Sequence, residues 1–118
     1  MTILQAIHQV DALIPNTCPQ NRKVDWLSQL DGMLHTQILY PAGNVPYVPY
    51  DPQGSGEQVL LAQPPFDRIY PLWLEAQIHY FNGEITRYNN AIALFNTQYS
   101  ALGDHHLRSK MPPARRFR

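Results

Sequence analysis

Apolar side chains recur at alternating steps of four and three residues through the second half of this chain, and no other feature constrains the fold as strongly. The stripe consists of Leu74, Ile78, Phe81, Ile85, Tyr88, Ile92, Phe95, Tyr99 and Leu102. Such spacing puts side chains on one face of an α-helix, and here it lasts for about four heptads. The sequence therefore predicts one long amphipathic helical segment over residues 66–102, with these side chains as its core-facing stripe.

Local signals concern the continuity and the ends of this segment. The Asn-Gly pair that ends at Gly83 permits either two helices folded as a hairpin or one helix that is continuous or kinked. Because the stripe keeps its phase across Gly83, we favour the continuous or kinked helix. Asp67 or Tyr70 is expected to cap the start, with Pro71 tolerated in the first turn, and Gly103 is expected to end the helix.

Two further helices are expected before residue 40. Thr2 is placed to cap the first, which ends at Pro15 and whose apolar face consists of Ile3, Ile7, Val10 and Ile14. Asn21 is placed to cap the second, whose apolar residues are Val24, Trp26, Leu27, Leu30, Met33, Leu34 and Ile38. Gly32 in the second helix marks either a close helix approach or a tolerated exposed position. The short link between the helices favours antiparallel neighbours, so we predict an all-α fold, a small helical bundle.

Residues 40–65 differ abruptly from the rest because they contain six prolines and three glycines. Proline lacks the N–H group that a helix needs, so this segment is predicted to be extended or polyproline-like. The apolar run at residues 59–62 suits a short strand paired with residues 45–50 across a turn at residues 54–56. An isolated hairpin is marginally stable and would need support from the helices or from a neighbouring subunit. We expect a Pro-rich loop or a short β-hairpin inserted into the helical domain.

The length of 118 residues suffices for one compact domain, which we place at residues 1–107. Only 15% of the residues are charged, and the formal net charge is zero. This weak surface charge has two explanations: other subunits cover part of the surface, or the surface is rich in uncharged polar residues. The lone Cys18, the lack of a signal-peptide pattern and the lack of an apolar run of bilayer length predict a protein made in a cytoplasm, without a membrane role.

Residues 108–118 form a basic tail that holds five of the nine Lys and Arg residues, namely Arg108, Lys110, Arg115, Arg116 and Arg118. No acid accompanies them and two prolines lie among them, so we expect an extended segment that is mobile in isolation. It is either a solvated terminus or a binding segment for an acidic groove or for nucleic-acid phosphates. With a neutral body and no basic face on the helices, recognition of a nucleic-acid duplex is disfavoured.

No set of side chains has the spacing of a catalytic, metal or cofactor site. The acids fall mostly at capping or exposed positions. Cys18 has no neighbouring His or basic residue that would activate its thiol, which favours a structural cysteine. His105 and His106 beside Asp104 are favoured as a solvated helix end, because adjacent histidines on a helix point about 100° apart. We therefore expect neither an enzyme nor a bound cofactor.

Aromatic side chains beside the stripe are more numerous than one helix face requires. Trp73 and Tyr80 lie off the centre line of the stripe. They are either core residues or contacts to a neighbouring subunit, where aromatic side chains are enriched.

Several segments carry a resemblance to a known family: residues 24–33 (VDWLSQLDGM), 80–90 (YFNGEITRYNN) and 93–96 (ALFN), preceded by residues 64–70 (PPFDRIY). They resemble the head-to-tail connector, or adaptor, proteins encoded in the head-gene cluster of tailed bacteriophages and prophages. The likeness covers most of residues 3–112, in the same order. The sequence departs from this family at Pro71 and in its basic ending after Pro112.

The resemblance implies a helical, noncatalytic protomer of the virion neck that assembles as a ring, commonly a dodecamer, beneath the portal protein. DNA passes through the ring toward the tail without sequence recognition. The implied portal-binding residues of the tail are Arg108, Lys110, Met111, Pro112, Arg115, Arg116, Phe117 and Arg118. The implied contacts to ring neighbours or to the next neck protein are Tyr47, Tyr50, Trp73 and Tyr80. A nucleic-acid-binding accessory protein of DNA packaging and a tail-side completion protein remain as alternatives.

Overall fold

The computed structural model describes residues 1–54 and 56–110, except for the side chain of residue 110. Four α-helices make up most of this part of the chain: α1 (Ile3–Leu13), α2 (Gln20–Leu34), α3 (Ile69–Phe81) and α4 (Ile85–Lys110). A π-helical turn, η1 (His35–Leu39), continues α2, and a 3-10 turn, η2 (Phe66–Arg68), leads into α3. The predicted all-α class is confirmed, because the described residues contain helices and no strand. None of the described helices is long and apolar enough to cross a membrane.

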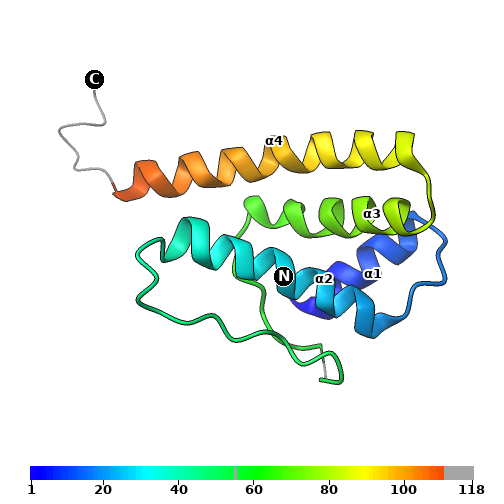
Figure 1. The fold of residues 1–118 in the computed structure, drawn as a ribbon, viewed down its shortest axis with the longest axis horizontal. Coiled ribbons are helices and arrows are strands. Elements are labelled where there is room, and N and C mark those ends of the chain that lie inside the picture. The colour runs from blue at the N-terminus through cyan, green and yellow to red at the C-terminus, as the bar shows by residue number, and fades with distance from the viewer. Residues whose placement is uncertain (55, 111–118) are drawn as a thin grey trace.

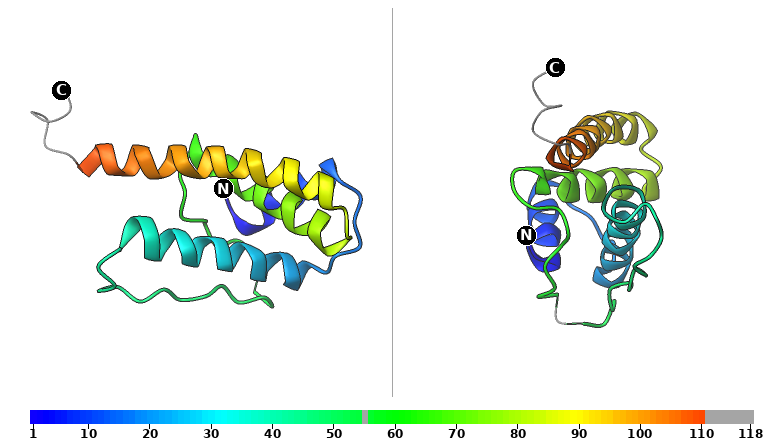
Figure 2. Two further views of the ribbon diagram at one scale, coloured as in Figure 1. Left: turned by 45° about the horizontal axis from the view of Figure 1, so that its top comes forward. Right: turned by 90° about the vertical axis from the view of Figure 1, so that its left-hand side faces the viewer.

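Helix α3 lies in the middle of the molecule, with α4 on one side and α1 and α2 on the other (Figure 1, Figure 2). Its buried residues point in different directions around the helix axis; they are Ile69, Tyr70, Leu74, Ala76, Ile78 and His79. A helix that is apolar all round needs neighbours on every side, which explains its central place. Helix α4 runs antiparallel to α3 and turns its other face to solvent (Figure 1).

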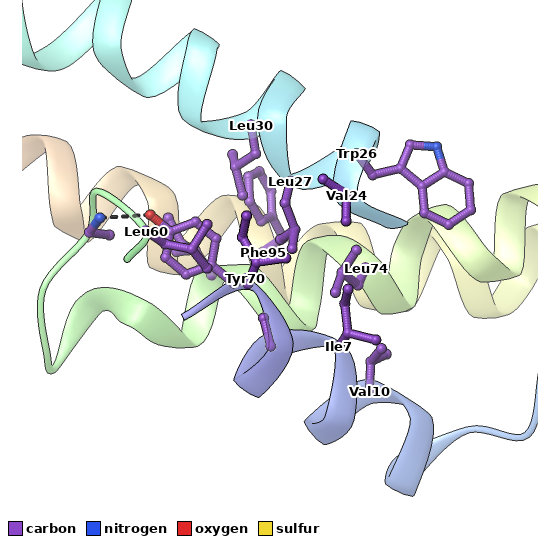
Figure 3. Packing of buried hydrophobic residues seen from close by; sticks show 14 of the residues in the cluster. Ile7, Val10, Val24, Trp26, Leu27, Leu30, Leu60, Tyr70, Leu74 and Phe95 are labelled. Carbon is purple, nitrogen blue, oxygen red and sulfur yellow. Dashed lines mark hydrogen bonds between the residues drawn. The ribbon is translucent and has the colours of Figure 1, made fainter. Parts of the chain in front are cut away.

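Most of the core lies between α3 and the pair formed by α1 and α2, and α4 adds Phe95 and Leu102 to it (Figure 3). Its members drawn there include Ile7, Val10, Val24, Leu27, Leu30, Tyr70 and Leu74. The first helix begins as predicted: the Thr2 side chain accepts a hydrogen bond from the Gln5 N–H, and the Gln5 side chain accepts one from the Thr2 N–H. This reciprocal capping satisfies two N–H groups that the helix itself leaves without partners.

The prediction of one continuous or kinked helix over residues 66–102 is wrong, because the chain reverses direction between α3 and α4. Gly83 has a φ of 75°, a left-handed conformation that ends helices and that glycine adopts without steric strain. The N–H groups of Asn82 and Gly83 close the last turn on the carbonyls of Ile78 and Tyr80, at 3.0 and 3.1 Å. A stripe that keeps its phase is compatible with a hairpin, because each of the two helices can turn its own part of the stripe toward the other helix.

The chain reversal divides the predicted stripe. Leu74, Ile78, Phe95 and Leu102 are buried, and Tyr88, Ile92 and Tyr99 are partly buried. Phe81 and Ile85 are not core residues, because about half of each side chain is exposed. These two residues flank the turn, where α3 and α4 no longer cover each other.

Gly103 does not end the last helix, because α4 continues for seven residues beyond it. A Cβ atom at Gly103 would lie 3.8 Å from Cδ1 of Ile38 in η1, and two residues later the ring of His105 lies 4.7 Å from that of Phe66 in η2. Helix α4 packs against η1 and η2 in this region, and this packing offsets the cost of a glycine in a helix, which is about 1 kcal/mol.

Two predicted helix starts are also displaced. Helix α2 begins at Gln20, so Asn21 lies in its first turn and does not cap it. Asp67 lies inside η2 and Tyr70 inside α3, and neither provides a side-chain cap. Pro71 falls in the first turn of α3, where its missing N–H has no partner to lose.

We call residues 40–65 the strap, because they run along α2 and return to α1 (Figure 1). The predicted β-hairpin is not formed among the described residues. Val59 instead makes an antiparallel bridge with Thr2, and the Ile3 N–H donates to the Gln58 carbonyl at 3.0 Å. The first N–H groups of a helix have no partner within it, so the start of α1 offers donors that the strap accepts. The loop alternative therefore describes this segment.

Candidate interaction surfaces

Polar side chains hold the strap against α2. The Tyr47 hydroxyl donates to the Ser28 carbonyl at 2.9 Å, and the Tyr50 N–H donates to the Ser28 Oγ at 3.0 Å. At the end of the helix, Nε2 of the buried His35 donates to the Val45 carbonyl at 2.8 Å. These bonds satisfy backbone groups of a segment that has no regular structure, and they fix its course along the helix.

Gly32 permits the ring of Tyr47 to lie directly on α2. A Cβ atom there would be 3.2 Å from Cε2 of Tyr47, which is tighter than an ordinary contact. The close approach expected at Gly32 is thus made by the strap and not by another helix. Tyr47 and Tyr50, expected to contact neighbouring subunits, use their hydroxyls within the chain and are half-buried.

A buried carboxylate ties the strap to two helices. Asp31 of α2 is fully buried and accepts hydrogen bonds from the hydroxyls of Tyr50 and Tyr70, the latter at 2.7 Å, and from the Leu61 N–H at 3.1 Å. The Tyr70 hydroxyl in turn accepts a bond of 2.6 Å from the Ala62 N–H (Figure 3). Three donors on one carboxylate offset part of the cost of burying it, and they join α2, α3 and the strap.

The surroundings of Asp31 determine which groups carry protons. Burial raises the pKa of Asp31 above its ordinary value, although the hydrogen bonds to Tyr50 and Tyr70 act in the opposite direction. Burial and the nearby carboxyl raise the pKa of both tyrosines, so both hydroxyls remain donors. Asp31 is an exception among the acids, which were expected mostly at capping or exposed positions. The sequence could have predicted this burial, because Asp31 lies four residues after Leu27 and three before Leu34, on the apolar face of the helix.

Trp73, predicted as a core or subunit contact, is half-buried where three helices meet. Its Nε1 donates to the Trp26 carbonyl in α2 at 2.9 Å, and its ring lies 5.0 Å from that of Phe95 in α4. The side chain therefore links α2, α3 and α4.

Tyr80 lies in an exposed aromatic group at the end of the α3–α4 hairpin, which we call the hairpin surface: Tyr80, Phe81, Ile85 and Tyr88. The exposed fractions of Tyr80, Phe81 and Ile85 are 63%, 51% and 55%. The Tyr80 and Tyr88 rings are 5.4 Å apart, and the Phe81 ring meets Trp26 of α2 edge-on at 6.4 Å. The hairpin surface thus lies on the α2 side of the molecule. Apolar side chains gathered and exposed in this way mark a contact site more often than scattered ones do.

A second apolar surface lies on the α1 side. It is a hollow of ≈ 400 Å³, which we call the flank hollow, lined by Leu13, Ile14, Pro15, Glu75, His79, Arg87, Asn90, Ala91 and Leu94. Leu13 and Leu94 at its edge are 70% and 59% exposed. Sequence patterns did not predict this hollow, since it depends on how the end of α1 meets the α3–α4 hairpin.

A buried histidine joins the two sides of the hairpin turn. Nδ1 of His79 lies 3.0 Å from the Glu84 carboxylate, and its Nε2 lies 3.6 Å from that of Glu75. The hydrogen bond from His79, together with Arg87 at 3.2 Å, lowers the pKa of Glu84. These pairs stabilise the turn and leave the Glu75 carboxylate beside the flank hollow.

The predicted boundary between domain and tail falls inside α4. Arg108 and Lys110 are helical residues, and Arg108 is exposed. The other portal-binding residues expected from the resemblance lie in residues 111–118, outside the described part of the chain. In the part that is described, no group of three or more His, Cys, Asp and Glu residues is placed to hold a metal ion.

Comparisons with known proteins add no relative from which a function follows. No protein-family model, no curated protein and no solved structure matches this chain.

Proposed function

We propose that this chain is a structural connector of the neck of a tailed bacteriophage, a ring component that joins the portal protein to the tail and surrounds the passing DNA. The resemblance of residues 24–33, 80–90 and 93–96 to connector proteins supports the proposal. The observation that carries it is the course of α4, which has twice the length of α3 and takes the chain toward its basic ending at one end of the body (Figure 1).

The last turn of α4 is suited to a partner outside the chain. Leu107 and Arg108 are exposed, although the preceding turn still packs on η2 through His105. These two side chains are therefore not covered by the described part of the chain. A short segment that leaves a rigid helix end can enter a groove on another protein.

The distribution of charge supports a conduit and not a DNA-binding body. Nine acids and only four Lys and Arg residues occur in residues 1–107, which gives a formal charge of −5, whereas residues 108–118 carry +5. The body is thus acidic and not neutral, and the chain is neutral only as a whole. An acidic body repels DNA phosphates, which suits a wall past which DNA moves without sticking.

Mass measurement tests this function. The full chain would be analysed by light scattering alone and after mixing with the portal protein encoded in the same genome. A connector is expected to form a complex that contains both proteins in roughly equal copy number, whereas the chain alone is either a monomer or a ring. Failure to bind the portal protein at any ratio contradicts the proposal.

The alternative, a nucleic-acid-binding accessory protein, rests on the charge of +5 in residues 108–118. A protein that contacts phosphates loses affinity steeply as salt rises, by about a factor of ten or more between 50 and 200 mM when several contacts are made. A gel-shift series over salt separates the two functions, because a connector is expected to bind DNA weakly at every salt concentration.

A further inference from the structure

We infer that neighbouring copies of this chain join through two different surfaces, with the hairpin surface of one copy packed into the flank hollow of the next. This inference rests on the proposed ring and identifies which faces of the protomer form it. The partner is a second copy of the same chain.

The hairpin surface exposes apolar side chains at the end of the α3–α4 hairpin. Tyr80, Phe81 and Ile85 stand at the end of the α3–α4 hairpin with half or more of each side chain exposed. Their position is fixed by α2, because Phe81 packs against Trp26 and lies under the guanidinium of Arg22, 4.9 Å from its ring centroid. Aromatic side chains held rigidly in this way make efficient contacts, since little freedom is lost when they are buried.

The flank hollow has the size and lining to receive such side chains. An apolar cavity of about 150 Å³ accommodates one benzene ring. The flank hollow measures ≈ 400 Å³, and Leu13, Ile14, Pro15 and Leu94 provide apolar walls. Insertion of one or two aromatic rings would remove both surfaces from water at the same time.

Charged groups lie beside both surfaces. Arg22 brings a cation to the hairpin surface, and Glu75 brings an acid to the flank hollow. Arg87 also lines the flank hollow, but it is already paired with Glu84 of its own chain at 3.2 Å. Docking of the apolar groups would therefore place Arg22 of one copy toward Glu75 of the next. Such pairing favours one orientation of the contact and disfavours the contact of two identical surfaces.

The position of the two surfaces favours a repeating contact. The hairpin surface adjoins α2 and the flank hollow adjoins α1, and these helices lie on opposite sides below α3 (Figure 2, right). Within α4, Ile85 and Leu94 are nine residues apart, which places them about 180° apart around the axis. A contact between two different faces passes from copy to copy and yields a ring when its rotation closes, whereas a two-fold dimer uses one face twice.

Disulfide trapping tests the contact directly. Tyr80→Cys and Leu94→Cys would be made separately in a Cys18→Ala background, with an affinity tag on one of them so that the three possible dimers differ in size. The two proteins would be mixed and oxidised at about 1 mM each, where a contact with a Kd near 1 mM is roughly one third populated. Circular dichroism and thermal unfolding establish that each variant is folded before mixing.

The expected product is the mixed Tyr80→Cys/Leu94→Cys dimer, in at least about tenfold excess over either homodimer. The matched control pair is Gln53→Cys and Ser100→Cys, two exposed polar positions that belong to neither surface. A mixed dimer no more abundant than that of the control pair overturns the inference, and so does a predominance of Tyr80→Cys homodimers.

The result is separable from that of the portal experiment. If the mixed dimer is trapped but the portal protein is not bound, the contact between the two surfaces stands and the neck function is rejected. If the portal protein is bound but no mixed dimer forms, even when the portal complex itself is oxidised, the proposed function stands. The ring then uses other faces of the protomer.

Discussion

The hydroxyl of Tyr70 in α3 donates a hydrogen bond of 2.7 Å to the carboxylate of Asp31 in α2, and both residues are fully buried. The same hydroxyl accepts the Ala62 N–H of the strap. One oxygen atom therefore connects three segments that are far apart in the sequence. Its removal leaves a buried donor and part of a buried carboxylate without a partner, which makes the contact testable by a single substitution.

Tyr70→Phe is expected to lower the free energy of unfolding by about 2–3 kcal/mol, because the lost oxygen satisfies two buried groups. Urea denaturation measures the change. Tyr99→Phe is the matched control, since the Tyr99 hydroxyl donates only to the exposed Gln37 at 3.2 Å and its loss should cost less than about 0.5 kcal/mol. Equal losses in the two variants would show that the Asp31 network contributes nothing of its own.

Asp31→Asn is expected to reveal how the stability depends on pH. Burial raises the pKa of Asp31 above the ordinary value of 3.8, so the folded chain binds this proton more tightly than the unfolded chain. Asp31 then makes its full contribution to the free energy of unfolding at pH values below its pKa in the unfolded chain. This contribution is lost as the pH rises through its pKa in the folded chain. The free energy of unfolding of the wild type, minus that of Asp31→Asn, should be larger at about pH 3.5 than at about pH 7. Urea denaturation at both pH values measures it, and a difference that grows with pH would mean that the three hydrogen bonds outweigh burial.

Gly83→Ala and Gly103→Ala are expected to change stability in opposite directions. The φ of 75° at Gly83 is strained for any residue with a Cβ, so alanine there should cost about 1 kcal/mol. Gly103 lies within α4 with room for a methyl group, and alanine there should add about 0.5–1 kcal/mol through helix propensity. Thermal unfolding of both variants measures the two shifts. A loss of stability in Gly103→Ala would mean that the approach to η1 tolerates no added atom.

Truncation after Pro112 is expected to leave the domain folded and to abolish binding to the portal protein. The removed residues follow α4 and include three of the five basic residues of the tail. Circular dichroism measures folding, and co-sedimentation with the portal protein measures binding. Replacement of Arg115, Arg116 and Arg118 by Ser at unchanged length separates charge from contact area. Undiminished portal binding by the truncated chain refutes the role assigned to the tail.

Sequence signals that act over a few residues determined the start of α1, the lack of a helix in residues 40–65 and the all-α class. Thr2 and Gln5 lie three residues apart and form the capping box of α1 wherever the rest of the chain lies. The prolines of residues 40–65 exclude a helix there, because each lacks an N–H group. The apolar spacing of α1, α2 and α4 likewise gives each helix a buried face, which makes the all-α class readable from the sequence.

The tertiary structure decided the features that depend on distant partners. Gly83 reverses the chain and Gly103 does not, although both are glycines within one heptad pattern; the difference is that η1 and η2 pack against α4 around Gly103. The strap joins α1 because unpaired N–H donors are available at the start of that helix, and it joins α2 by donating hydrogen bonds to Ser28. Asp31 is buried because two tyrosines and a backbone N–H reach it from other segments. Capping and helix periodicity act over a few residues, whereas burial and hydrogen-bond satisfaction are settled only when the whole chain is packed.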